Sequence, residues 1–121
     1  MILSRFALIG AILSGSTLGA NAKIIAFQCS LPNMNPLVFT LYSDGTPARV
    51  GTATGVGSKA SATRDKFGAL VFVEMNNDGT PVSFSTIQKN MEIIHSRHLL
   101  LLDGSILSPS QNKGRCSKIP L

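Results

Sequence analysis

The chain has 121 residues and a formal net charge of +5, with 44% hydrophobic and 14% charged residues. This length corresponds to one domain. The basic residues are scattered and do not alternate with aromatic residues, which argues against a platform for single-stranded nucleic acid. There is no tryptophan and only one tyrosine, Tyr42, which argues against a carbohydrate-stacking surface.

The first 22 residues have the pattern of an export signal. Arg5 precedes an apolar run at residues 6–13, and Ala20-Asn21-Ala22 resembles a cleavage site. We expect residues 1–22 to be a signal peptide and residues 23–121 to be one mature domain, located in the periplasm or secreted. The apolar run is shorter than the roughly 20 residues of a membrane span, so no transmembrane segment is expected after cleavage. The alternative is an uncleaved amphipathic or anchoring helix.

The mature chain has an all-β pattern, because apolar residues alternate and turn residues recur about every ten positions. About seven or eight short strands are expected. In chain order they are residues 23–30, 37–42, 48–54, 67–75, 81–87, 91–102 (one bent strand, or two broken near Ser96), 105–107 and a last strand at 115–116. Turns are expected at 43–47, 76–79, 88–90, 103–104 and 112–114. The small residues at 55–66 predict the most flexible part of the domain, and the tail from Ser117 is expected to fray.

The strand at 67–75 is apolar on both faces. Leu70 and Phe72 share one face, while Val71, Val73 and Met75 share the other. This pattern indicates a central, doubly covered strand, or a strand with one side against a partner.

The two cysteines lie near the ends of the mature chain. In an exported protein, Cys29 and Cys116 are expected to form one disulfide; two buried free thiols are the alternative. A disulfide needs Cα atoms within about 7 Å, so the first and last strands should be neighbours. That arrangement favours a small antiparallel β-barrel over a β-sandwich.

The segment His95-Ser96-Arg97-His98 contains both histidines. Residues three apart on a strand point to opposite faces, so these histidines do not readily share a metal. We interpret the segment as polar residues at a strand bend, with a partner or small-ligand surface as the alternative. The segment 108–116 is polar and held by the expected disulfide, which would lower the ordering cost of binding. The candidate binding residues are Ser58, Lys59, Ser61, His95, Arg97, His98 and Gln111.

No catalytic residue, metal or cofactor is expected. The chain has no GxSxG elbow, no CxxC spacing and no paired carboxylates, and no helix follows the glycines at 55–57.

The layout of the chain resembles small periplasmic β-barrel proteins of the C-type lysozyme inhibitor kind. The shared features are Phe27-Gln28-Cys29 in the first strand, Gly114-Arg115-Cys116 near the end, and a central small-residue loop at 57–62. The resemblance implies a barrel that plugs a hydrolase cleft with the loop around residues 58–61. The chain departs from the family pattern in having Thr63-Arg64-Asp65 where a tyrosine would follow this loop, and in being basic.

Together these features predict an exported, non-enzymatic binding or envelope-associated protein. It would be a monomer that binds a protein or a small ligand, and not nucleic acid. The alternatives are a lysozyme-inhibitor-like protein and a small hydrolase that uses His95 or His98.

Overall fold

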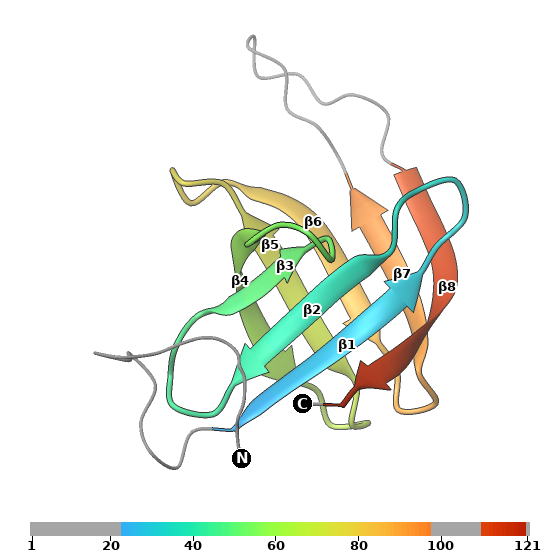
Figure 1. Cartoon of the computed structure of the whole chain (residues 1–121), viewed down its shortest axis with the longest axis horizontal. Helices are drawn as coiled ribbons and strands as arrows, with labels where there is room; N and C mark the ends of the chain where they lie inside the picture. The colour runs from blue at the N-terminus through green and yellow to red at the C-terminus, as the bar shows by residue number, and fades with distance from the viewer. Residues whose placement is uncertain (1–22, 98–109, 121) are drawn as a thin grey trace, which may run out of the picture.

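The fold is a closed antiparallel barrel in a computed structural model that describes residues 23–97 and 110–120 (Figure 1). The strands are β1 (Ile24–Ser30), β2 (Leu37–Tyr42), β3 (Ala48–Gly51), β4 (Ser58–Arg64), β5 (Leu70–Met75), β6 (Pro81–Ile87), β7 (Glu92–Arg97) and β8 (Ser110–Ile119). Each strand pairs with the next along the chain, and β8 pairs with β1. Within the described ranges, no helix is long and apolar enough to cross a membrane.

Closure of the barrel depends on the pairing of β1 with β8. Cys29 lies opposite Cys116 in this pair, and the two form a disulfide across 87 positions of sequence. The predicted barrel, the predicted disulfide and the predicted contact between first and last strands are therefore confirmed. Closure pairs each of the eight described strands with a neighbour on both sides.

Aromatic and aliphatic side chains fill the barrel. Phe39 of β2 and Phe72 of β5 are 0% exposed, and their ring centroids lie 5.0 Å apart although their strands are not neighbours. Ile93 of β7 is equally buried. Because the barrel is a single layer, β5 is not covered by a second sheet, and Val71 and Val73 on its outer face are half-buried.

The segment predicted to be most flexible instead contains a regular strand, β4. Ala60 and Ala62 of β4 face the interior, and Ala62 lies opposite Phe72. Small side chains at these positions leave room for the phenylalanine rings. The tract therefore supplies space inside the barrel, and the prediction of a flexible segment there is wrong.

The turn predicted at 112–114 is also wrong, because these residues lie inside β8. Gly114 lies where β8 meets the end of β1, and a Cβ atom at this position would overlap the carbonyl oxygen of Ser30. Glycine here allows the close approach of two strands rather than a change of direction. The tail predicted to fray from Ser117 is part of β8 as far as Ile119.

The other turns follow the prediction where the structure describes them. Gly45 and Gly79 have φ angles of 91° and 86°, and the amide of Gly79 donates to the carbonyl of Asn76 at 2.9 Å. The strand expected at 48–54 ends at Gly51, and the one expected at 67–75 begins at Leu70. The predictions for residues 98–109, including the turn at 103–104 and the strand at 105–107, lie outside the described residues.

Candidate functional site

The two ends of the barrel differ in chemistry. The upper end in Figure 1 carries the connections 31–36, 52–57 and 76–80, and the lower end carries 43–47, 65–69 and 88–91 with Lys23 and Pro120. Many of the side chains that point inward at the lower end and in the middle are apolar, such as Leu70, Ile87 and Ile93. Toward the upper end, polar side chains take their place.

These polar side chains form an inward polar cluster, which we define as Ser58, Glu74, Ser83, Ser85, His95 and Arg97. The strand register places them on the inner face. Glu74, Ser83 and Arg97 lie side by side on β5, β6 and β7, and Ser85 lies opposite His95 one step deeper. Ser58 starts β4 opposite the buried Val50.

Two short hydrogen bonds organise the cluster. The hydroxyl of Ser83 donates to Oε1 of Glu74 at 2.7 Å, and Oγ of Ser85 lies 2.7 Å from Nδ1 of His95. Ser83 and Ser85 are fully buried. Burial of a polar group costs free energy unless the group is hydrogen-bonded. These two hydrogen bonds therefore offset the cost of burying Ser83 and Ser85.

Within the inward polar cluster, His95 is a buried titratable side chain with one ring nitrogen that makes no hydrogen bond to a described residue. The residue is 2% exposed, and its Nε2 has no hydrogen-bond partner among the described residues. Burial lowers the pKa of His95 below its usual range, and the charge of Arg97 lowers the pKa further; the charge of Glu74 acts in the opposite direction. The imidazole is therefore neutral at pH 7.

The contact between Ser85 and His95 resembles part of a hydrolase triad, but the arrangement does not present a nucleophile. Ser85 has no exposed surface, and Glu74 bonds to Ser83. A nucleophile must reach the carbon that it attacks. In this structure the Ser85–His95 contact is a buried hydrogen bond that satisfies polar groups of the interior.

The predicted binding residues separate into two groups. Ser58, His95 and Arg97 face inward at or near the upper end, whereas Lys59, Ser61 and Gln111 face outward. The amide of Gln111 donates to the hydroxyl of Ser96 at 3.1 Å on the outer face. His98 lies outside the described residues. The expected loop at 57–62 is wrong, because residues 58–61 belong to β4 and alternate between the two faces of the sheet.

The prediction did not include Glu74, Ser83 and Ser85. The sequence shows that Ser83, Ser85 and Ile87 share one face of β6, but a face with two serines is not an obvious inner face. Only pairing with β5 and β7 turns this face inward.

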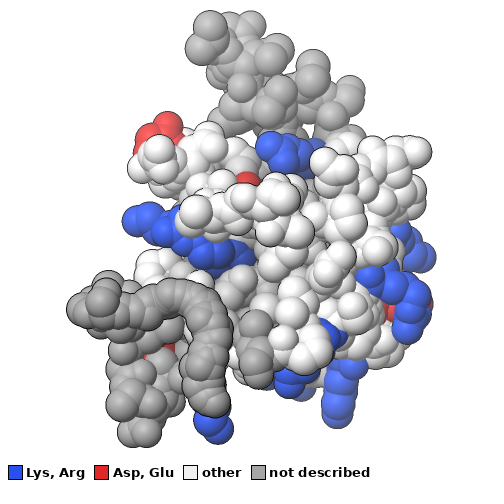
Figure 2. Space-filling view, viewed as in Figure 1, with Lys and Arg blue, Asp and Glu red and all other residues white. Residues whose placement is uncertain are grey.

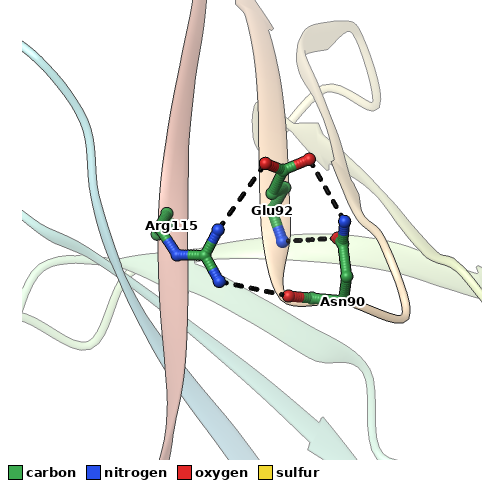
Figure 3. Close-up of polar contacts among 3 residues, drawn as sticks. All are labelled: Asn90, Glu92 and Arg115. Carbon is green, nitrogen blue, oxygen red and sulfur yellow. Dashed lines mark hydrogen bonds and ion pairs between the residues drawn. The ribbon is translucent and has the colours of Figure 1, made fainter.

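A second polar group lies on the outside of the barrel near its lower end (Figure 3). Arg115 of β8 is 3.5 Å from the carboxylate of Glu92 on β7 and donates to the carbonyl of Asn90 at 3.4 Å. Asn90 in turn bonds to Glu92 through its side chain at 3.2 Å and 3.0 Å. These side chains are exposed, so each bond contributes little, and the group chiefly ties the turn before β7 to β8. A pocket beside it is lined by Gln88, Glu92, Ile93, Ile94, Lys113, Gly114 and Arg115.

Within residues 23–97 and 110–120, no group of three or more His, Cys, Asp or Glu residues lies close enough to hold a metal ion. Comparisons with protein-family models, with curated proteins and with solved structures find no match. What is established is the small disulfide-closed antiparallel barrel itself, and these comparisons identify no family for the chain.

The burial of His95 predicts how stability depends on pH. Its pKa is lower in the folded state than in the unfolded state, so the unfolded chain binds the proton first as the pH falls below about 6.5. We expect the free energy of unfolding to fall with decreasing pH from that point, by at most about 1.4 kcal/mol per pH unit from this group.

The measurement is urea unfolding of the wild type and His95→Gln between pH 8 and pH 5. Glutamine does not titrate, and both proteins retain His98, so the difference between the two curves isolates His95. The wild type should lose more stability than the variant on acidification. Parallel curves would contradict the prediction.

Proposed function

We propose that the protein is an exported, non-enzymatic binding protein that recognises its ligand with the upper end of the barrel. The disulfide indicates an oxidising, extracytoplasmic environment. The observation that carries the proposal is the inward polar cluster. The interior of an eight-stranded barrel is just wide enough to be filled by side chains. Burying apolar side chains there would cost less free energy than burying polar ones.

Arg97 indicates the chemistry of the ligand. Its guanidinium group is exposed at the rim and makes no ion pair or hydrogen bond with another described residue, while the hydroxyl of Ser83 on the neighbouring strand is held by Glu74. Guanidinium groups bind carboxylates through two parallel hydrogen bonds. The upper end is therefore suited to a carboxylate, on a small molecule or on a protein side chain.

Affinity capture from the envelope fraction tests this proposal. Immobilised wild-type protein, Arg97→Gln and Lys113→Gln would be incubated with the same extract, and bound proteins and small molecules identified by mass spectrometry. Lys113 is an outward-facing cation on β8, so its replacement is a matched control for charge. A ligand of the upper end should be retained by the control and lost about tenfold or more with Arg97→Gln. Equal retention by all three proteins would refute the assignment to this end.

A lysozyme-inhibitor-like activity is the second candidate. The disulfide between the first and last strands of a closed eight-stranded barrel is the arrangement that the resemblance implies. Ser58 lies at the upper end, although on a strand rather than on a loop. An assay of lysozyme activity with micromolar protein tests this candidate, and undiminished activity would exclude it.

A further inference from the structure

The lower end of the barrel exposes a phenylalanine on a hydrogen-bonded turn. Phe67 lies between β4 and β5 and is 75% exposed. The carboxylate of Asp65 accepts hydrogen bonds from the amides of Phe67 at 2.8 Å and Ala69 at 2.9 Å. Gly68 completes the turn with a φ angle of 86°. These bonds hold Phe67 at the tip and occupy the one carboxylate of the turn.

One cation lies over this phenylalanine, and two more lie against the neighbouring Gly68 of the same turn. The ammonium group of Lys66 lies 5.2 Å from the centroid of the Phe67 ring. The guanidinium group of Arg64 donates to the carbonyl of Gly68 at 3.0 Å. Lys89, from the turn between β6 and β7, lies against Gly68, with its Cδ 3.6 Å from the place a Cβ would take. We name Arg64, Lys66, Phe67 and Lys89 the basic aromatic tip.

The lower end carries further cations beyond this tip, and the upper end also carries cations, among them Lys59 and Arg97. Lys23 and Lys118 also lie toward the lower end. Figure 2 shows lysine and arginine side chains in blue toward both ends of the barrel. The most exposed large apolar residue of the upper end, Val56, is 81% exposed and lies in a connection without any charged residue. Among the described residues, Phe67 is the aromatic ring with the largest exposed fraction, and an ammonium group lies over it.

We propose that the basic aromatic tip docks the protein on the surface of an anionic lipid bilayer. Phe67 would enter the interface between headgroups and acyl chains, and Arg64, Lys66 and Lys89 would pair with lipid phosphates. A turn that projects from the end of a barrel fits a flat surface, whereas single-stranded polyanions are bound in grooves that follow their backbone. An exposed ring with cations on the same turn and beside it also matches a surface that is negative outside and apolar beneath.

This docking goes beyond the proposed function, because it uses the opposite end of the barrel. A protein held by its lower end would turn the inward polar cluster away from the bilayer. The lower end would then attach the protein to the bilayer, and the upper end would bind its ligand.

Vesicle sedimentation tests the proposal. Protein purified from the exported fraction would be mixed with vesicles of phosphatidylcholine alone or with about 30% phosphatidylglycerol. We expect binding to the anionic vesicles only, and weaker binding as salt increases. Phe67→Ser and the double variant Lys66→Gln/Lys89→Gln should each lower the partition coefficient about fivefold or more.

Val56→Ser and Lys59→Gln are the matched controls, since they remove an exposed apolar side chain and an outward cation toward the upper end. Both should change the partition coefficient less than twofold. All variants carry the same N-terminal sequence, so residues 1–22 cannot account for a difference between them. Circular dichroism verifies that each variant is folded.

Three results would overturn the proposal. The first is no binding to anionic vesicles, and the second is a loss of vesicle binding with Val56→Ser as large as that with Phe67→Ser. The third is that Phe67→Ser weakens binding to soluble heparin but leaves binding to vesicles unchanged. The last would assign the tip to a polyanion instead. Arg97→Gln should bind vesicles like the wild type, so failure at the upper end is distinguishable from failure at the tip.

Discussion

Reduction of the Cys29–Cys116 disulfide is expected to lower the free energy of unfolding by roughly 2–5 kcal/mol. The bond closes a loop across 87 positions, and such a cross-link restricts the unfolded chain strongly. It also joins the two strands whose pairing closes the barrel. For a domain whose total stability is about 5–15 kcal/mol, this loss would impair folding at 37 °C.

Urea unfolding at 37 °C with and without a thiol reductant measures this effect. The double variant Cys29→Ala/Cys116→Ala is the internal control, because reductant should leave its unfolding curve unchanged while its midpoint matches that of the reduced wild type. An identical midpoint for the oxidised and reduced wild type would show that closure does not depend on the bond.

Phe72→Ala is expected to cost about 3–5 kcal/mol, as for other buried phenylalanines. Phe72 is 0% exposed and packs against Phe39 across the interior. The residue opposite it on β4, Ala62, is small and cannot fill the space left by the ring. The barrel wall is a continuous hydrogen-bonded sheet, so it has little freedom to collapse onto the cavity.

Chemical denaturation of Phe72→Ala and of Phe67→Ala compares the loss of a buried ring with the loss of an exposed one. Phe67 is mostly exposed, so its replacement should change the free energy of unfolding by no more than about 0.5 kcal/mol. Similar losses in the two variants would contradict the packing described for the interior.

The candidate site could be predicted in part. The two-residue period of a strand puts Ile93, His95 and Arg97 on one face, and the structure turns that face inward. The same rule applied to β6 could not show that its serines face inward, because Val82 and Phe84 are the more apolar alternative. The orientation of β6 follows from its register with β5, where Glu74 lies opposite Ser83.

The errors at β4 and β8 have the same origin. Small residues at 58–63 and a glycine at 114 are local signals of flexibility and turning. In the barrel, the alanines of β4 make room for aromatic rings, and Gly114 permits close contact with Ser30. Local signals cannot distinguish these uses, because both depend on side chains and strands that are distant in sequence.

The amino-acid sequence by itself determined the all-β class, most strand positions, the tight turns and, through two cysteines, the contact between first and last strands. These properties depend on side-chain alternation, backbone preference and the short reach of a disulfide. The tertiary structure decided which face of each strand points inward, and so brought Glu74, Ser83 and His95 to one end and Arg64, Phe67 and Lys89 to the other. Alternation defines two faces of a strand, but only closure of the barrel and pairing with neighbours select the inner one.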